Sequence, residues 1–556
     1  MGRIVGIDLG TSTSEIACII DGAPVVIPNT IGRLITPSVV HIGDDGETLV
    51  GEPAAEYLFT RPDCTFMEVK RMTGGGKTVK VRGKEYSPED LQSILIRYLC
   101  GCAAEYLGEP VERAVITVPA YFTDVQRRLT ARAGELAGLT VERIINEPTA
   151  AAMDYGLSNL SESRNILVFD FGGGTLDVTV LELFSGVIDV KASCGNNKLG
   201  GKDFDEIIMG KLADVSGDDR ALMRIKKAAE DCKIALSSAE EYNISLPFLS
   251  TGAYGKPVSV EKTVTRNEFD EWVRDKVESA RAPILTALSD SGLSASDLDM
   301  VLLVGGSTRI PCIRRFVADE LSTVPQSHVD PDLTVVRGAA IQAGIIEGVF
   351  TDGYELILTD VCPYTLGIAV VDNDFYDKRQ IFDPIIQRNT TIPVDVKKIY
   401  GTHHDNQTEA DIEVYQGDSI NLEYDEYLGK IRLSGIPAAR RGKETVEVTL
   451  SYDMNGILQV TCKSVSSGKQ VNAEIKTAGI QPLPTVDLAK WESAEGAKRF
   501  RPAIRRAEKI IAADEDDTGD IDKLTRSIKE ALIRGDMQKA EEQRDILIEI
   551  MEALRQ

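Results

Sequence analysis

The sequence predicts a multidomain protein in which an α/β domain is followed by an all-β sandwich and a short helical segment. Three observations predict this order. A glycine-rich strand–turn–strand unit occurs twice, strands and helices alternate over residues 1–353, and strands then follow one another without helices over residues 364–480. Alternating elements are typical of α/β domains, whereas uninterrupted short strands indicate a sandwich. Residues 485–556 are charged and show helical patterning.

The unit that organises the chain spans residues 165–181. An apolar run ends at Asp170, three glycines follow, and an alternating apolar run begins after Thr175. Two β-rich runs around a short glycine-rich turn predict a hairpin. Its N–H groups can approach an anion, and Asp170 and Asp177 would oppose that anion unless a divalent metal lies between them. The pattern predicts a site for a metal-bound polyphosphate; taken alone, the segment fits an ordinary glycine-rich hairpin as well.

The same unit occurs at residues 5–20, and the two copies align with one constant offset. Four chemically matched positions pair Asp8 with Asp170, Gly10 with Gly172, Thr13 with Thr175, and Glu15 with Asp177. Two such hairpins facing each other across a cleft would hold the phosphates of a nucleotide from both sides. The repetition therefore favours the nucleotide site over an ordinary hairpin.

Composition restricts the classes of partner. The 556-residue chain has a formal net charge of −25, which argues against nucleic acid or an anionic membrane as the main partner. The strand expected from Ile4 leaves no room for a signal peptide, and no apolar run has the length of a membrane span. The nine cysteines contain no C-x-x-C pair and indicate reduced thiols. We therefore expect a cytoplasmic protein.

Between the two repeats, the pattern predicts a strand at residues 38–42, helices at residues 88–107 and 124–137, and a strand at residues 114–118 that ends at Pro119. Lys70 and Arg71 follow a short apolar stretch. Residues 144–152 form a strand that turns at Pro148 into an alanine-rich helix, and alanine permits close helix packing. Glu147 lies at this turn, from which a side chain can point into a cleft.

Beyond the second repeat, a glycine turn at residues 199–204 precedes a helix. A second helix, predicted over residues 224–237, carries Glu230, Lys233 and Ser237 in one polar stripe, for which a solvated face is the alternative. A strand at residues 300–304 then ends in a glycine pair and Arg309. A planar guanidinium beside glycines suits a flat base and a ribose.

Several of these segments resemble the ATPase domain of the seventy-kilodalton heat-shock chaperones, the DnaK family. They are D-L-G-T-S-T at 8–13, V-P-A-Y-F at 118–122, I-I-N-E-P-T-A-A-A at 144–152, D-F-G-G-G-T-L-D at 170–177 and V-G-G-S-T-R-I-P at 304–311. The resemblance implies an actin-like fold with duplicated ribonuclease-H-like halves over residues 1–353. It also implies hydrolysis of ATP to ADP and phosphate, with Mg²⁺ and K⁺ as cofactors.

The resemblance further implies residue roles. Asp8 and Asp170 would hold Mg²⁺, largely through its waters. Lys70 would neutralise charge on the γ-phosphoryl group, and Glu147 and Asp177 would position the attacking water and cations. The β- and γ-phosphates would be bound by Gly10, Thr11, Ser12 and Thr13, and by Gly172, Gly173, Gly174 and Thr175, with Asp170 and Thr175 in the catalytic set. The rest of the nucleotide would contact Glu230, Lys233, Ser237, Gly305, Gly306, Ser307, Arg309 and Asp332. Pro119 and Arg127 match the family's relay to the peptide-binding domain.

One residue departs from the family pattern in this domain. Lys202 occupies a turn position that is usually acidic in the family. A lysine there predicts weaker cation binding at this turn.

Residues 354–363 are predicted to be an interdomain linker, and residues 364–480 a substrate-binding sandwich. Strands are expected at 364–371, 379–386, 391–400, 409–415, 429–434, 444–451 and 456–463. The segments R-N-T-T-I-P at 388–393 and N-G-I-L-Q-V at 455–460 resemble the family's peptide-binding domain. The segment L-T-D-V-C-P-Y-T-L-G at 358–367 resembles most closely the short HscC branch.

The family's peptide groove maps onto Ile368, Val371, Tyr400, His403, Ala410 and Ile412. The resemblance implies that it binds an extended apolar segment; plain sandwich core is the alternative for each residue. Ala410 replaces a larger apolar residue and His403 a small one, so the peptide preference is not inherited. Helices expected at 501–513, 520–534 and 536–554 would form the family's lid within residues 485–556.

The leading hypothesis is an ATP-driven chaperone for unfolded or specific client polypeptides. The resemblance implies a J-domain co-chaperone, and the need for a nucleotide exchange factor stays open. A small-molecule kinase of the same superfamily is disfavoured because a β-sandwich is appended and no acceptor-sugar domain is inserted. A filament-forming actin-like protein is disfavoured because the C-terminal extension would obstruct stacking.

Overall fold

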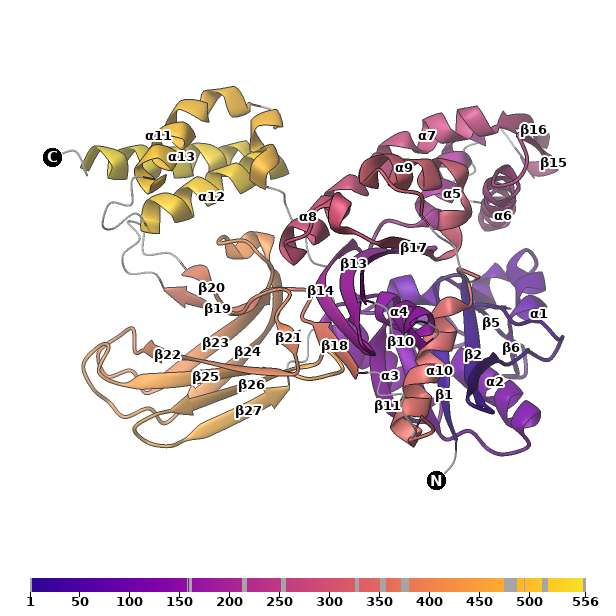
Figure 1. Ribbon diagram of the computed structural model, residues 1–556, viewed down its shortest axis with the longest axis horizontal. Helices are drawn as coiled ribbons and strands as arrows, with labels where there is room; N and C mark the ends of the chain where they lie inside the picture. The colour runs from indigo at the N-terminus through magenta and orange to yellow at the C-terminus, as the bar shows by residue number, and fades with distance from the viewer. Residues whose placement is uncertain are drawn as a thin grey trace. The chain divides into compact units, whose positions relative to one another are not determined.

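The computed structural model describes residues 3–157, 159, 163–212, 218–251, 257–325, 330–350, 357–371, 380–474, 488–494, 496–512 and 519–553. The chain divides into two compact units. The first contains Met1–Pro363 and Met454–Ile457, and the second contains Tyr364–Asp453 and Leu458–Gln556 (Figure 1). Within the described residues, no helix is long and apolar enough to cross a membrane.

Two sheets with the same pairing pattern form the centre of the first unit. One has the order β11-β10-β1-β2-β3, and the second contains the run β17-β12-β13-β14-β18. The strands of the first are β1 (Ile4–Leu9), β2 (Thr13–Ile20), β3 (Ala23–Val26), β10 (Arg113–Val118) and β11 (Thr140–Asn146). Those of the second are β12 (Ser163–Phe171), β13 (Leu176–Phe184), β14 (Val187–Asn196), β17 (Met300–Val304) and β18 (Ile357–Val361).

The predicted duplication is present in the strand register. β1 pairs antiparallel with β2 and parallel with β10, and β12 pairs antiparallel with β13 and parallel with β17. Asp8 lies opposite Glu15 in the first hairpin, and Asp170 lies opposite Asp177 in the second. Both glycine-rich segments are therefore hairpins, and their acidic residues occupy equivalent positions.

Helices α4 (Glu147–Leu157) and α10 (Thr334–Glu347) pack against each other and against the two sheets (Figure 1). A Cβ atom on Gly338 would lie 1.7 Å from the carbonyl oxygen of Ala150. A Cβ atom on Gly6 would lie 2.3 Å from the backbone nitrogen of Ala340. Only small residues permit this approach, which confirms the close packing predicted for the alanine-rich helix.

The predicted helices flank these sheets with bounds that capping explains. α2 begins after Ser87 and α3 after Thr123, and both side chains form capping boxes. The helix predicted over residues 224–237 begins earlier, at Asp219, because the Asp218 carboxylate accepts a hydrogen bond from the Ala221 N–H group. The helices are α1 (Glu52–Ala55), α2 (Pro88–Leu107), α3 (Asp124–Leu136), α5 (Gly201–Leu212), α6 (Asp219–Leu236), α7 (Arg266–Glu278), α8 (Arg281–Ser291) and α9 (Pro311–Leu321). The further strands are β4 (Thr36–Pro37), β5 (Val39–Ile42), β6 (Thr48–Val50), β7 (Thr65–Met67), β8 (Val79–Val81), β9 (Lys84–Tyr86), β15 (Glu241–Thr251) and β16 (Pro257–Thr265).

The segment predicted to be a linker is partly a strand. Residues 354–356 lie outside the described residues, and Ile357–Val361 form β18, which pairs in parallel with β14. The Thr359 hydroxyl donates a hydrogen bond of 2.5 Å to Asp189 of β14. The open edge of β14 thus gives the apolar residues of this segment a pairing partner, which a reading of the linker alone could not anticipate.

The second unit contains two four-stranded sheets, β20-β19-β23-β24 and β22-β25-β26-β27. All seven predicted strands have counterparts, but the strand predicted at residues 391–400 is divided at Pro393, which has no N–H group for a ladder. β27 was not predicted because its sequence, Q-V-N-A-E, has weak apolar alternation. The strands are β19 (Leu366–Val371), β20 (Gln380–Ile386), β21 (Thr391–Ile392), β22 (Val394–Gly401), β23 (Glu409–Gln416), β24 (Glu426–Ser434), β25 (Thr445–Tyr452), β26 (Leu458–Ser464) and β27 (Gln470–Glu474).

The helices of the second unit, α11 (Arg501–Ala512), α12 (Gly519–Arg534) and α13 (Met537–Ala553), share one apolar core. α12 also contacts the loop between β23 and β24 through polar side chains. The Ser419 hydroxyl donates to Glu530 at 2.5 Å, and the Asn421 amide donates to the Ser527 hydroxyl at 2.6 Å. The predicted helices end within a residue or two of the observed ones.

Candidate functional site

The two glycine-rich turns face each other in the first unit. A Cβ atom on Gly173 would lie 2.4 Å from the Ser12 hydroxyl oxygen, and one on Gly174 would lie 3.0 Å from the Thr11 hydroxyl oxygen. A Cβ atom on Gly10 would lie 2.1 Å from the carbonyl oxygen of Thr13. Glycine is therefore required by close approach in both turns, and the predicted phosphate-binding residues 10–13 and 172–175 are brought together.

Two further segments support the second turn. The N–H groups of Gly201 and Lys202 donate to the carbonyl oxygens of Gly172 and Gly173 at 3.0 and 2.9 Å. The Ser307 hydroxyl donates to the Gly172 carbonyl oxygen at 2.8 Å. The predicted turn at residues 199–204 and the predicted G-G-S-T-R segment therefore meet at one place, although more than a hundred residues separate them.

Acidic side chains from both hairpins are buried beside these turns. Burial, and then the nearby Glu147 carboxylate, raises the pKa of Asp8 and of Asp170, and raises the pKa of Asp177 to about 7. Burial and the Asp8 carboxylate raise the pKa of Glu15 well above its usual range. Among the described residues, Glu15 Oε1 and Asp177 Oδ2 have no hydrogen-bond partner. Buried carboxylates with so few donors fit oxygen-preferring cations such as Mg²⁺.

Lys70 supplies a positive charge close to these carboxylates. It lies in the short helix η3 (Val69–Met72), and its Nζ atom donates to Glu147 Oε1 at 2.5 Å. The Lys70 side chain is 6% exposed, and its ammonium lies 5.5 Å from the centre of the Phe122 ring. Glu147 reaches it from the first turn of α4, where the strand-to-helix turn was predicted to present this side chain.

The polar stripe of α6 is not a solvated face. Lys233 is buried, and its Nζ atom contacts both carboxylate oxygens of Asp205, at 2.8 and 2.9 Å, and the Gly201 carbonyl oxygen at 3.1 Å. Ser237 caps the helix, and its hydroxyl donates to the Lys233 carbonyl oxygen at 3.3 Å. The stripe therefore faces α5 and the turn at residues 199–204, so Lys233 is turned toward the glycine turns.

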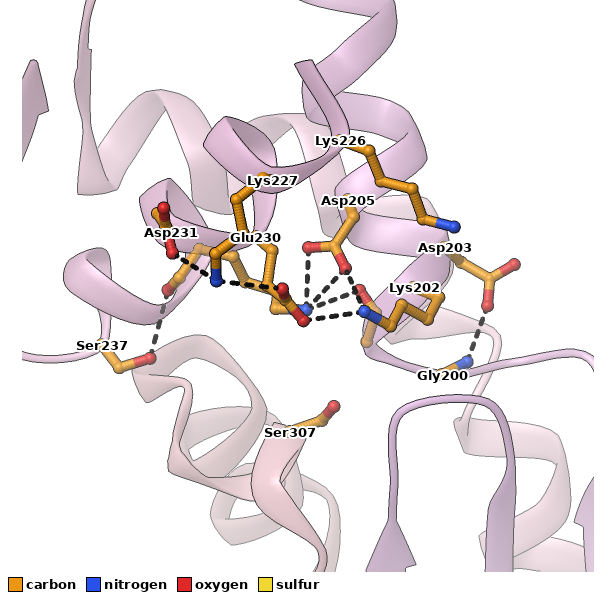
Figure 2. Close-up of polar contacts among 12 residues, drawn as sticks. Gly200, Lys202, Asp203, Asp205, Lys226, Lys227, Glu230, Asp231, Ser237 and Ser307 are labelled. Carbon is orange, nitrogen blue, oxygen red and sulfur yellow. Dashed lines mark hydrogen bonds and ion pairs between the residues drawn. The ribbon is translucent and has the colours of Figure 1, made fainter. Parts of the chain in front are cut away.

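Lys202, the departure from the family pattern, lies inside this cluster. Its Nζ atom is 2.7 Å from Glu230 Oε1 and 3.6 Å from Asp205 Oδ2 (Figure 2). It is also 3.5 Å from Glu68 Oε1. Burial disfavours the charged form of Glu230, but the Lys202 ammonium outweighs that cost and lowers the pKa of Glu230 to about 2. Lys202 is therefore a partner of the predicted nucleotide contact Glu230.

Arg309 extends from the segment that follows β17. Its guanidinium donates to Asp332 at 2.7 Å and to Asp330 at 2.6 Å, and these carboxylates raise its pKa against the cost of burial. A Cβ atom on Gly306 would lie 3.4 Å from Asp332 Oδ1. The predicted residues Gly305, Gly306, Arg309 and Asp332 are thus gathered beside the second turn.

Arg127 connects the strand-to-helix turn before Glu147 to β18 through hydrogen bonds. Its guanidinium donates to Asn146 Oδ1 at 2.6 Å and to the Ala120 carbonyl oxygen at 2.9 Å. The Asn146 amide then donates to Asp360 at 2.9 Å, and the Thr149 hydroxyl donates to Asp360 at 3.2 Å. The carbonyl oxygen of Pro119, the second predicted relay residue, accepts from the Phe122 N–H group at 3.1 Å.

The predicted groove residues lie on β19, β22 and β23 of the second unit and on the turn after β22. Ile368 and Ile412 are buried, whereas Val371, Tyr400, His403 and Ala410 remain partly exposed. Ile368 pairs with Val414, two residues from Ile412 and therefore on the same face of β23. Two of the six residues thus have the burial of ordinary core, and the other four are partly exposed to solvent.

Some residues of the site were missed by sequence reasoning. Glu15 is part of the repeat, and its alignment with Asp177 was the available signal. The Thr117 hydroxyl donates to Asp8 at 2.6 Å, and the Tyr121 N–H group donates to Asp177 at 2.9 Å. No sequence pattern marked Asp205 or Glu68 as residues of the site. Their roles arise from contacts between segments distant in sequence.

Comparison with known proteins identifies the family. The family model described as Hsp70 protein matches residues 4–78 and 73–553. The chaperone protein DnaK of Thermotoga neapolitana is 43% identical over 519 residues, which cover 91% of this chain and 85% of the relative. Those of Thermotoga petrophila and Thermotoga maritima are also 43% identical over 519 residues, with the same coverage. The chain therefore belongs to the Hsp70 family.

Proposed function

We propose that this protein is an ATP-dependent chaperone in which ATP hydrolysis controls the affinity of a β-sandwich groove for extended segments of client polypeptides. The ATPase domain would comprise residues 1–353 and have the actin-like fold. Residues 354–363 would connect it to a substrate-binding domain at residues 364–480 and a lid at residues 485–556. The observation that carries the proposal is the pair of facing glycine turns with buried carboxylates in equivalent positions.

The nucleotide phosphates would bind between the two turns, where N–H groups and the hydroxyls of Thr13 and Thr175 are available as donors. The base and ribose would lie near Glu230, Lys233 and Arg309. Lys233 is fixed by Asp205, and Glu230 is fixed by Lys202, so both side chains are preorganised. Preorganised charged groups lose little freedom when a ligand binds.

Hydrolysis needs positioning and charge stabilisation more than covalent chemistry from the protein. Asp8 and Asp170 would hold Mg²⁺, largely through its waters, and this ion would neutralise charge on the β- and γ-phosphates. Glu147 and Asp177 would orient the attacking water and K⁺. Lys70 would stabilise the charge that develops on the γ-phosphoryl group, and its hydrogen bond to Glu147 holds it there.

The hydrogen bonds from Arg127 to Asn146 and from Asn146 to Asp360 support a coupling route. Asn146 precedes Glu147, so a shift of Glu147 on ATP binding would disturb contacts that hold β18. β18 leads directly into the sandwich. Such coupling requires that ATP bind two arrangements of the chain with different affinity.

The partners of this activity would be unfolded or specific client polypeptides and a J-domain co-chaperone. The groove would include Ile368, Val371, Tyr400, His403, Ala410 and Ile412. One buried apolar side chain contributes about 1.5–3 kcal/mol, so binding would be reversible.

A hydrolysis assay tests the nucleotide part of the proposal. The purified wild-type chain is expected to bind ATP and to hydrolyse it only with Mg²⁺. The Asp170→Asn variant should lose hydrolysis, whereas the control variant Asp189→Asn, with its substitution on β14, should stay active. Hydrolysis that persists in Asp170→Asn would contradict the assigned site.

A further inference from the structure

A partly exposed polar group joins the two sheets of the sandwich beside the proposed groove. Asp383 lies on β20 in one sheet, and Lys398 and Tyr400 lie on β22 in the other. The Tyr400 hydroxyl donates to Asp383 Oδ2 at 2.6 Å. Lys398 Nζ is 3.2 Å from each Asp383 carboxylate oxygen and 2.6 Å from the Pro384 carbonyl oxygen.

Register places these three side chains on inner faces. Asp383 pairs directly with Ile368, and directly opposed residues of antiparallel strands share a face. Ile368 is 4% exposed, so this face is the inside. Along β22, Lys398 and Tyr400 continue the inner row of Val394 and Val396, which alternates with exposed residues. Inner faces of a sandwich are ordinarily apolar, so a carboxylate and an ammonium here are unusual.

The Asp383 carboxylate keeps capacity to accept another hydrogen bond. The side chains of Asp383 and Lys398 are 28% and 40% exposed. Charge-assisted N–H···O bonds are typically about 2.7–2.9 Å, so the 3.2 Å contacts of Lys398 to Asp383 are weak beside its bond to Pro384. Among the described residues, the hydrogen bond from Lys398 is the one that Asp383 Oδ1 accepts.

Tyr400 is itself a proposed groove residue, and its hydroxyl proton is committed to Asp383. Burial, together with the Asp383 hydrogen bond, raises the pKa of Tyr400, so the hydroxyl stays protonated. An apolar side chain seated here would cover the carboxylate without replacing its water, which is unfavourable. A side chain with an N–H donor would replace that water with a hydrogen bond to a charged acceptor.

We propose that Asp383 is a specificity-determining residue of the groove, which selects client segments whose central side chain is a cation or an amide donor within apolar flanks. This inference rests on the proposed function, since it assumes that peptides bind between Ile368 and Tyr400. It gives the groove a substrate class distinct from purely apolar segments.

The test measures the affinity of the full chain, in ADP, for three fluorescent seven-residue peptides. They share apolar flanks and carry Arg, Gln or Leu at the centre. Wild type is expected to bind the Arg and Gln peptides more tightly than the Leu peptide. Asp383→Asn is expected to lower the Arg-to-Leu preference about tenfold, the value of one hydrogen bond to a charged group. The control Asp411→Asn, which alters an ion-paired carboxylate on an exposed position of β23, is expected to leave the preference unchanged.

Tyr400→Phe provides a second variant that keeps the ring. It is expected to shift the preference in the same direction, because loss of the hydroxyl alters the Asp383 position. An unchanged preference in both variants, with ATP still releasing the peptides, would overturn the inference and leave the proposed function in place. Failure of all three peptides to bind would contradict the proposed function itself, and the inference with it.

Discussion

Replacement of Lys70 by alanine tests whether its ammonium group stabilises charge during ATP hydrolysis. Lys70 Nζ is buried and 2.5 Å from Glu147, so its position is held before ATP binds. Removal of one preorganised charged donor costs about 10²–10³ in rate, or roughly 2.7–4 kcal/mol of transition-state stabilisation. ATP affinity should change little, because in the proposed site the glycine turns would supply most of the phosphate contacts.

The assay is single-turnover hydrolysis of ATP, with nucleotide affinity measured separately by fluorescence. Loss of one partner of a buried ion pair can also destabilise the fold by about 3–5 kcal/mol, so the thermal midpoint is measured for every variant. Lys191→Ala removes a half-buried lysine paired with Glu182 and Asp189 and serves as the matched control. A Lys70→Ala variant that stays folded, binds ATP and hydrolyses it at the wild-type rate would refute the reasoning.

Three other predictions follow from the structure. Gly200→Ala should weaken ATP binding about tenfold or more, because its Cβ atom would lie 2.4 Å from the Gly174 backbone nitrogen. The control Gly210→Ala places a Cβ atom in open space on α5 and should bind ATP normally. Equal ATP affinities of the two variants, measured by titration, would contradict the role of the turn. Asp360→Ala removes the acceptor of the Asn146 and Thr149 hydrogen bonds, and it should abolish the effect of ATP on peptide release while basal hydrolysis continues. The control Thr359→Ala should keep the effect of ATP. A wild-type response to ATP in Asp360→Ala would contradict the coupling route. Burial, then Glu530 and Asp418, raises the pKa of Asp425 to about 8, so the folded state holds this proton more tightly than the unfolded state. The resulting stability is complete below pH about 4 and is lost as the pH rises toward 8, by at most about 1.4 kcal/mol per pH unit. The thermal midpoint of the wild-type protein should therefore fall between pH 6 and pH 8, and that of Asp425→Asn should fall less steeply. An equal fall in the two proteins would contradict the raised pKa of Asp425.

Local patterns carried the prediction where the physical cause is local. The bounds of α2 follow from the Ser87 capping box and from Gly108 in a left-handed conformation at its end. The duplicated hairpins could be predicted because each is a continuous segment with its own turn. Strand register then places the two acidic residues of each hairpin opposite each other, Asp8 with Glu15 and Asp170 with Asp177.

Contacts between distant segments could not be predicted in this way. Glu68 adopts a left-handed backbone conformation with φ of 57° and meets Lys202 and Lys226, and no spacing in the sequence signals that meeting. The polar stripe of α6 has the pattern of a solvated face, and only the packing of α5 makes Lys233 a buried partner of Asp205. Asp383 lies in an apolar strand, and its role depends on Tyr400 in the opposite sheet.

The central claim is that nucleotide state in the first unit controls peptide binding in the second. The most direct test is the dissociation rate of a bound fluorescent peptide, measured from the ADP form and again after addition of ATP with Mg²⁺. We predict a large acceleration by ATP, present in Lys70→Ala and absent in Asp360→Ala. Dissociation at the same rate in both nucleotide states of the wild-type protein would contradict the account.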